Sequence, residues 1–257
     1  MSTSKSINQF SLDRFLLVLK RTIVLNQRMW VIGFLSVGGF LLVVGILPFI
    51  SNMFNITRPG FAAVREPAIF FYMLGGLVLT SMIFSELHTP TKAFQFLTLP
   101  STTWEKITAA WFTGTVIYTV VTMASIFVLS AMIETVKGIN TGVWSPFFIF
   151  NPFTSEIFST ILLYTFYQSI YLLGAVYFHK NNFLKTLLVI IGFSLGFIFF
   201  FNIGFLIFGL AQSEEFFINI QIGSQPWFVY AKYIIGTGLT MLFIWLSYLQ
   251  LKNKQVA

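Results

Sequence analysis

Residues 86–106 read ELHTPTKAFQFLTLPSTTWEK and form a polar stretch, here called the island, between two long apolar stretches at 69–84 and 107–133. A simple reversal of the chain needs only a few polar residues, whereas the island has about twenty. It also contains two prolines and several aromatic residues. We therefore expect the island to be a structured element that contacts something, and not a bare turn.

The composition around the island is that of a membrane protein. Of the 257 residues, 56% are hydrophobic and only 9% are charged, against roughly 25% charged residues in an ordinary soluble domain. The chain has no cysteine, which excludes disulfides, thiolate metal sites and cysteine nucleophiles. The net charge is +7. In a membrane protein the positions of the charges along the chain are informative, and the expected partner is the lipid bilayer and not nucleic acid.

Six segments are long and apolar enough to cross a bilayer as helices, which takes about 20 residues. They lie at about 30–51, 69–86, 107–133, 157–178, 186–210 and 228–251. The sequence thus predicts an all-α polytopic membrane protein whose first span is retained and is not a cleaved signal peptide. The outer connections are expected at about 52–68, 134–156 and 211–227.

The distribution of lysine and arginine predicts the orientation. With the N-terminus inside, eleven of the 15 basic residues fall on inner segments, and the other four are Arg58, Arg65, Lys137 and Lys232. The positive-inside rule then places both termini and the island in the cytoplasm. We expect the bacterial cytoplasmic (inner) membrane to be the location.

The first 29 residues are predicted to form a separate cytoplasmic amphipathic helix ahead of a six-helix domain at 30–257. Apolar residues between positions 10 and 28 share one helical face: Leu12, Phe15, Leu16, Leu19 and Ile23. Arg14, Arg21 and Arg28 follow heptad spacing on the opposite face. This pattern is typical of a helix that lies at the inner membrane surface with its arginines toward headgroups or water. It either anchors the chain or also contacts a partner.

Sites for chemistry are sparse in this sequence. The P-loop pattern GxxxxGK[ST] and the zinc motif HExxH are absent, so we expect no catalytic residue, no metal site and no cofactor bound by this chain. The stretch GFSLG at 192–196 matches a serine-nucleophile pattern but lies within an apolar span. Gly192 and Gly196 are better explained by close helix packing. Gln168 and Asn202, polar residues within spans, either line a path or bond across helices.

The island itself carries two helix-start signals. Thr89-Pro90 is typical of an N-cap followed by proline at the first helical position, and this predicts a short helix that ends before Pro100. Thr102-x-x-Glu105 is a capping box that starts a second helix leading into the third span. The apolar residues between these signals either dip into lipid headgroups or dock onto a partner; they are Phe94, Phe96, Leu97 and Leu99.

The run FLTLPSTTWEKITAAWF at 96–112, which follows SELH at the end of the second span, resembles ABC-2-type transporter permeases, particularly those of Bacteroidetes-like bacteria. The resemblance implies an amphipathic helix, six spans and a coupling helix between spans two and three that docks into a groove of a separate ABC ATPase subunit. That subunit would bind ATP and magnesium, and a second permease copy or a related permease would complete the complex. Export is the expected direction of transport.

On this resemblance, the contact with the ATPase falls on island residues: Lys92, Phe94, Leu97, Pro100, Trp104, Glu105 and Lys106. Phe94, Leu97 and Trp104 would be the apolar contact, and the charged residues would form its rim. One departure concerns the connection between spans five and six. Family members often have substantial re-entrant helices there, whereas this chain has only about fifteen to twenty residues around Glu214 to Trp227.

Two other functions are compatible with the same sequence. One is a membrane scaffold or regulatory subunit that uses the island to dock a cytosolic partner without moving a substrate. The other is a membrane-embedded enzyme that acts on lipid, for which the sequence shows no convincing site. An adjacent reading frame that encodes a P-loop ATPase would favour the permease over both.

Overall fold

The computed structural model describes residues 10–51, 61, 64–88, 90–142, 144, 146, 149–209 and 226–256. Within these residues the chain forms eight α-helices and no strand, as the all-α prediction requires. Their bounds are α1 (Leu12–Ser51), α2 (Arg65–Ile83), α3 (Pro90–Leu97), α4 (Thr103–Phe112), α5 (Tyr118–Thr141), α6 (Ser155–Tyr177), α7 (Asn182–Gly209) and α8 (Pro226–Val256). A 3₁₀ turn lies at Ser85–His88, and a π-helical turn at Thr113–Ile117 joins α4 to α5.

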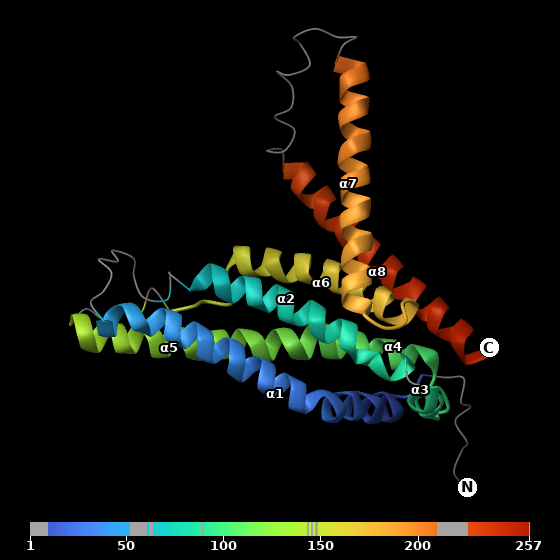
Figure 1. Ribbon diagram of the computed structural model, residues 1–257, viewed down its shortest axis with the longest axis horizontal. Coiled ribbons are helices and arrows are strands. Elements are labelled where there is room, and N and C mark those ends of the chain that lie inside the picture. The colour runs from blue at the N-terminus through green and yellow to red at the C-terminus, as the bar shows by residue number, and fades with distance from the viewer. Residues whose placement is uncertain are drawn as a thin grey trace.

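Six helical segments in the described part of the chain are long and apolar enough to cross a membrane, which confirms the predicted number. Helices α1, α2, α5 and α6 run side by side as a bundle (Figure 1). Helix α8 packs on α6, whereas α7 contacts α6 and α2 only near its start and then projects away from the bundle (Figure 1). The bundle therefore accounts for most of the packing, and α7 beyond its start exposes apolar side chains on all sides.

The beginning of α1, the island, the α6–α7 connection and the end of α8 lie together at one end of the bundle, here called the island end (Figure 1). The Ser11 N–H donates to Glu105 at 2.7 Å. The Lys254 Nζ donates to the Val176 carbonyl at 2.7 Å. The structure therefore groups the segments that the sequence assigned to the inner side. The end of α7 and the start of α8, however, lie to one side of the bundle and not at its opposite end (Figure 1).

The opposite end of the bundle has its own ionic contacts. The fully buried Glu134 carboxylate accepts hydrogen bonds from the Phe61 N–H at 2.8 Å and from Lys137 Nζ at 2.9 Å, and Arg65 pairs with Glu156. Helix α5 continues to Thr141, past residue 134, where the outer connection was expected to begin. The buried Glu134–Lys137 pair explains this, since it satisfies two charges within the last turns of the helix.

Several predicted features lie outside the described residues. They are the N-cap at Thr89, residues 52–60 and Arg58 of the first outer connection, and almost all of the connection at 211–227, including Glu214.

The predicted boundary between an interfacial helix and the first span is not present. Residues Leu12–Ser51 form one uninterrupted helix, so the boundary at residue 29 falls inside α1. The physical reason is local, because Gln27, Arg28 and Met29 are all good helix formers and no glycine or proline separates the two segments.

Three buried tyrosines from three helices form the centre of the bundle. The ring centroid of Tyr72 on α2 lies 5.7 Å from that of Tyr118 on α5 and 4.9 Å from that of Tyr164 on α6. The Tyr118 hydroxyl donates to the Tyr72 carbonyl at 2.8 Å, and the Tyr164 hydroxyl donates to the Gly114 carbonyl of the π-helical turn at 2.6 Å. Buried hydroxyls are thus paired with backbone acceptors. Gly76 gives the rings room, because a Cβ there would lie 2.4 Å from the Tyr164 hydroxyl.

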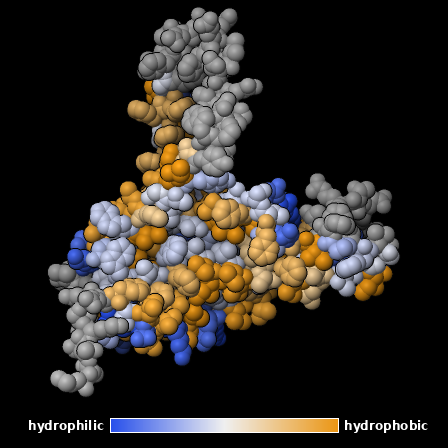
Figure 2. Space-filling model, turned by 180° about the vertical axis from the view of Figure 1, so that it is seen from behind, coloured by the Kyte–Doolittle hydropathy of each residue, from blue (hydrophilic) through white to orange (hydrophobic). Residues whose placement is uncertain are grey.

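The outer surface matches a membrane environment. Figure 2 shows large hydrophobic patches on this face of the bundle and on the described part of α7, mixed with residues of intermediate hydropathy. The strongly hydrophilic residues are few and form small groups near the ends and along the lower edge. An apolar belt between polar ends is the surface that a bilayer requires.

Candidate functional site

The island is a compact helical element at the end of the bundle (Figure 1). Helix α3 spans Pro90–Leu97, the chain turns, and α4 begins at Thr103. The turn is closed by backbone hydrogen bonds from the Thr98 N–H to the Phe94 carbonyl at 3.0 Å and from the Ser101 N–H to the Leu99 carbonyl at 2.7 Å. The predicted order of a short helix, a proline break and a second helix that enters a span is therefore confirmed.

Glu105 is the anchor of the island. It completes the predicted capping box, in which its N–H donates to the Thr102 hydroxyl at 3.2 Å and its carboxylate accepts from the Thr102 N–H at 2.8 Å. The same carboxylate also accepts from the Ser11 N–H at 2.7 Å and from Arg14 Nη2 at 2.9 Å. Its side chain is 0% exposed, so the structure places it inside the chain and not at the rim of an open surface.

The arginine face of α1 turns toward the island and not toward lipid or water. Arg14 binds Glu105, and Arg21 makes two hydrogen bonds to Glu86 at 2.6 and 3.0 Å. The cause is charge pairing, since carboxylates on the island offer partners that headgroups would otherwise supply. Of the three predicted arginines, Arg28 alone is exposed.

Lys106 is buried beside Glu105 and is likewise not a rim charge. It is 1% exposed, and its Nζ donates to the Leu97 carbonyl at 3.0 Å. The ammonium also lies 5.3 Å from the centroid of the Phe96 ring, which favours the positive charge. Among the described residues, no carboxylate forms an ion pair with it.

The surface that the island offers to a partner is smaller than predicted. Phe94 is 70% exposed, and Lys92 and Pro100 are also exposed. Leu97 instead packs against the apolar cluster that joins the island to α4, α6 and α8. Trp104 is partly exposed, and its ring stacks on Tyr248 of α8 at a centroid distance of 4.1 Å. The available contact is thus Phe94 with Lys92, Pro100 and the free side of Trp104.

Gln168 lies in the core and makes the cross-helix bond that the sequence allowed. Its Oε1 accepts from the Thr115 hydroxyl at 3.0 Å, and no described residue accepts from its Nε2. Gly114 allows this approach, because a Cβ there would lie 2.8 Å from that Nε2. Gln168 therefore links α6 to the π-helical turn.

The residues singled out on α7 have no such contact within one chain. Asn202 donates to the carbonyl of Ile198 in its own helix at 2.7 Å. A Cβ added at Gly192 or Gly196 would meet nothing within 4 Å. Within Asn182–Gly204, none of the residues of the apolar window is buried. The structure therefore does not bring these residues together with Gln168, and the packing face of α7 is open.

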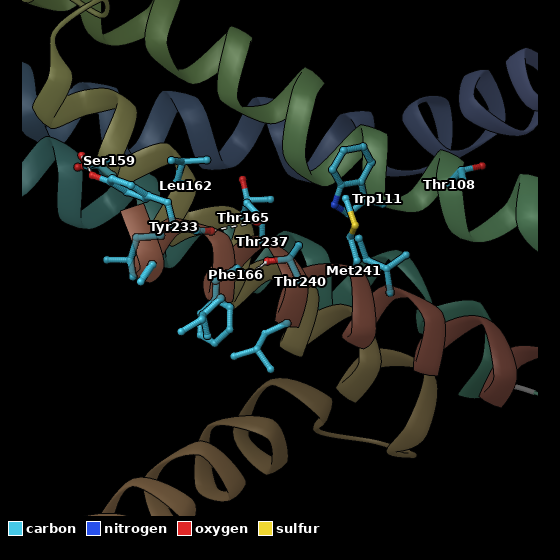
Figure 3. A pocket seen from close by; sticks show the side chains of 17 residues that line it. Thr108, Trp111, Ser159, Leu162, Thr165, Phe166, Tyr233, Thr237, Thr240 and Met241 are labelled. Carbon is cyan, nitrogen blue, oxygen red and sulfur yellow. Dashed lines mark hydrogen bonds between the residues drawn. The ribbon is translucent and has the colours of Figure 1, made fainter. Parts of the chain in front are cut away.

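An apolar groove of about 1030 Å³ lies between α4, α6 and α8 (Figure 3). Its walls include Trp111, Phe166 and Met241. The hydroxyls of its threonines donate to carbonyls of their own helices, as Thr165 does to Ile161 at 2.8 Å. Sequence reasoning missed this site, because its residues come from three helices and share no motif. The recurring threonines were the available signal: Thr108, Thr160, Thr165, Thr237 and Thr240.

No cluster of histidine and carboxylate side chains in the described ranges could hold a metal ion. Comparisons with protein-family models, with curated proteins and with solved structures found no match to this chain.

Proposed function

We propose that this chain is the membrane-spanning permease subunit of an ATP-driven ABC transporter of the ABC-2 type, and that it works as an exporter. The proposal rests on how the island is held: it is fixed to α1 by two ion pairs, and one of its aromatic side chains stays exposed. Its helices are clamped to α1 by Glu105–Arg14 and Arg21–Glu86, while Phe94 stays exposed on α3. Exposed aromatic side chains on rigid elements are typical of the residues that contribute most to binding at protein–protein interfaces.

A force applied to α3 would reach several spans at once. The island is continuous with α2 and α4 along the chain, the two ion pairs tie it to α1, and the Trp104–Tyr248 stack ties it to α8. Rigid-body movement of packed helices is a common way to couple a binding event to a conformational change. In this proposal the partner ATPase binds ATP and magnesium and presses on the island, and this chain has no ATPase activity of its own.

A second membrane subunit, identical or related, completes the proposed complex. Beyond its first turns, helix α7 is exposed on all sides, and Gly192 and Gly196 have open space around them. A helix of this kind is stabilised by lipid or by another transmembrane helix that approaches the glycines closely.

The proposed setting is the bacterial cytoplasmic membrane with both termini and the island in the cytoplasm. A periplasmic reporter fused after Thr98 should be inactive, and one fused near Gly142 should be active. The reverse pattern would place the island outside the cell and would contradict the proposal.

The coupling function is tested with the purified chain and an ABC ATPase encoded in an adjacent reading frame, which the proposal requires. Phe94→Asp should abolish the stimulation of ATP hydrolysis and the copurification of the two subunits. Phe153→Asp is the matched control, because Phe153 is 94% exposed and lies near the opposite end of the bundle, before α6. Leu97 is unsuitable for this test, since it packs against the core of the island. Undiminished stimulation by the Phe94→Asp variant would overturn the coupling role and favour a scaffold that docks its partner elsewhere.

A further inference from the structure

A small cavity at the island end is surrounded by more positive than negative charge. Its volume is about 130 Å³, and it lies between α1, α2, α3 and α4. Three cations line it, Arg21, Lys92 and Lys106, against one carboxylate, Glu86. Two positive charges are therefore in excess around a space with room for a few water molecules or one tetrahedral anion.

Among these cations, Lys106 has the highest free-energy cost of burial. It is 1% exposed and uses one of its three N–H donors on the Leu97 carbonyl. The neighbouring carboxylate of Glu105 is already occupied by Arg14, Ser11 and Thr102. Glu105 acts on the Lys106 charge only from beyond ion-pair distance. A buried ammonium that lacks a directly paired anion is unfavourable, so a bound anion would stabilise it.

Glu86 does not supply the missing charge. Both of its carboxylate oxygens accept hydrogen bonds from Arg21, and this pair is neutral as a unit. The positive charge of Lys92 and Lys106 is then left to face the cavity. Lysine ammonium groups arranged around a small polar space bind phosphate as point charges.

We propose that this cavity binds a phosphate group. The walls also include the apolar side chains of Leu25, Ile83 and Phe84, and Leu25 is exposed on the outside of α1. The cavity lies at an end of the apolar belt, where lipid headgroups are found if the bundle spans a bilayer. A lipid headgroup and a free phosphate ion present the same chemistry to these residues. The inference does not depend on whether the chain is a permease.

The test uses the full chain purified in a maltoside detergent that contains no phosphate, with binding followed by native mass spectrometry and by thermal unfolding. Dioctanoyl phosphatidic acid, inorganic phosphate and dioctanoylglycerol are titrated separately. Dioctanoylglycerol lacks only the phosphate of the first probe, so it reports binding through the acyl chains alone. Phosphatidic acid should bind and raise the unfolding temperature, and dioctanoylglycerol should do neither.

Variants assign the binding to the cavity. Lys106→Met keeps the length of the buried side chain and removes its charge, and Lys92→Gln changes an exposed residue that does not support the fold. Each should weaken binding of phosphatidic acid by about tenfold or more, the usual effect of a lost charge-assisted hydrogen bond. Lys20→Gln is the control, because Lys20 neighbours Arg21 on α1 but is exposed and does not line the cavity.

The separate titrations distinguish a lipid headgroup from a free phosphate ion as the ligand. Binding of inorganic phosphate that is lost in Lys106→Met and Lys92→Gln indicates a site for a free anion, and binding of phosphatidic acid alone indicates a lipid headgroup. The unliganded Lys106→Met protein should be at least as stable as the wild type, because it lacks the unpaired charge. Equal binding of phosphatidic acid to wild type, Lys106→Met and Lys92→Gln, or equal binding of dioctanoylglycerol to the wild type, would overturn the proposal.

Discussion

The Glu105 carboxylate joins the start of α4 to the start of α1, because it binds Arg14 while it caps its own helix. Its Oε1 lies 2.9 Å from Arg14 Nη2, and its Oε2 accepts from the Thr102 N–H at 2.8 Å. Two helix starts that are 91 residues apart in sequence therefore depend on one buried side chain. Loss of this group should loosen both.

Glu105→Ala should destabilise the protein by about 2–4 kcal/mol, since it leaves Arg14 without its partner and removes the cap. Glu105→Gln should cost less, because the amide oxygen still accepts one or two of the same hydrogen bonds. Chemical unfolding in detergent, followed by tryptophan fluorescence, measures both. Glu66→Gln, at an exposed position in the first turn of α2, is the control and should change little. A Glu105→Ala variant as stable as this control would show that the anchor is not structural.

The Trp104–Tyr248 stack should contribute a coupling energy between the island and α8. The rings are nearly parallel, at 11°, with centroids 4.1 Å apart, and aromatic pairs of this kind typically contribute about 1 kcal/mol beyond burial. A double-mutant cycle of Trp104→Ala and Tyr248→Ala measures it. The control is a cycle of Trp104→Ala with Trp245→Ala. Trp245 is exposed on α8, so this cycle should give no coupling energy. If Trp104→Ala and Tyr248→Ala lower the free energy of unfolding additively, the stack does not link the island to α8.

Gly76 and Gly192 form a matched pair of glycine positions with opposite expectations. A Cβ at Gly76 would lie within 2.6 Å of atoms of both Tyr164 and Tyr118, whereas at Gly192 it would meet nothing within 4 Å. Gly76→Ala should therefore destabilise the fold by about 1–3 kcal/mol through overpacking. Gly192→Ala should be neutral or stabilising by up to about 1 kcal/mol in the isolated chain, because alanine is the better helix former. Thermal unfolding of the monomeric chain distinguishes them, and a tolerated Gly76→Ala would mean that the tyrosine cluster can spread.

Local rules explain what the sequence could predict about this protein. The six spans follow from length and hydropathy alone, and the capping box follows from Thr102 and Glu105 three residues apart. The predicted number of spans and the two predicted island helices are therefore confirmed. These features depend on neighbours along the chain, where spacing and geometry are tightly linked.

Pairing between distant segments explains what the sequence could not predict. Hydropathy treats Arg14 and Arg21 as residues that seek water, but their carboxylate partners lie 91 and 65 residues away. Once those partners are present, the arginine face of α1 is the inner face. The same holds for the buried position of Lys106 and for the apolar groove, because each is defined by helices that only the tertiary fold brings together.

Helix α7 provides the last prediction, which concerns a second copy of the chain. No residue in the most apolar part of its span is buried in the monomer, and Gly192 and Gly196 are spaced for close approach of another helix. Gly192→Ile with Gly196→Ile should weaken self-association about tenfold or more, because branched side chains at such a contact introduce clashes of about 1–3 kcal/mol. Gly33→Ile on α1, at a glycine that also has open space around it, should leave association unchanged. Sedimentation equilibrium in density-matched detergent measures the effect. Equal association of the wild type and the α7 variant would show that α7 is covered by lipid or by a different subunit, and an effect of Gly33→Ile alone would move the interface to α1.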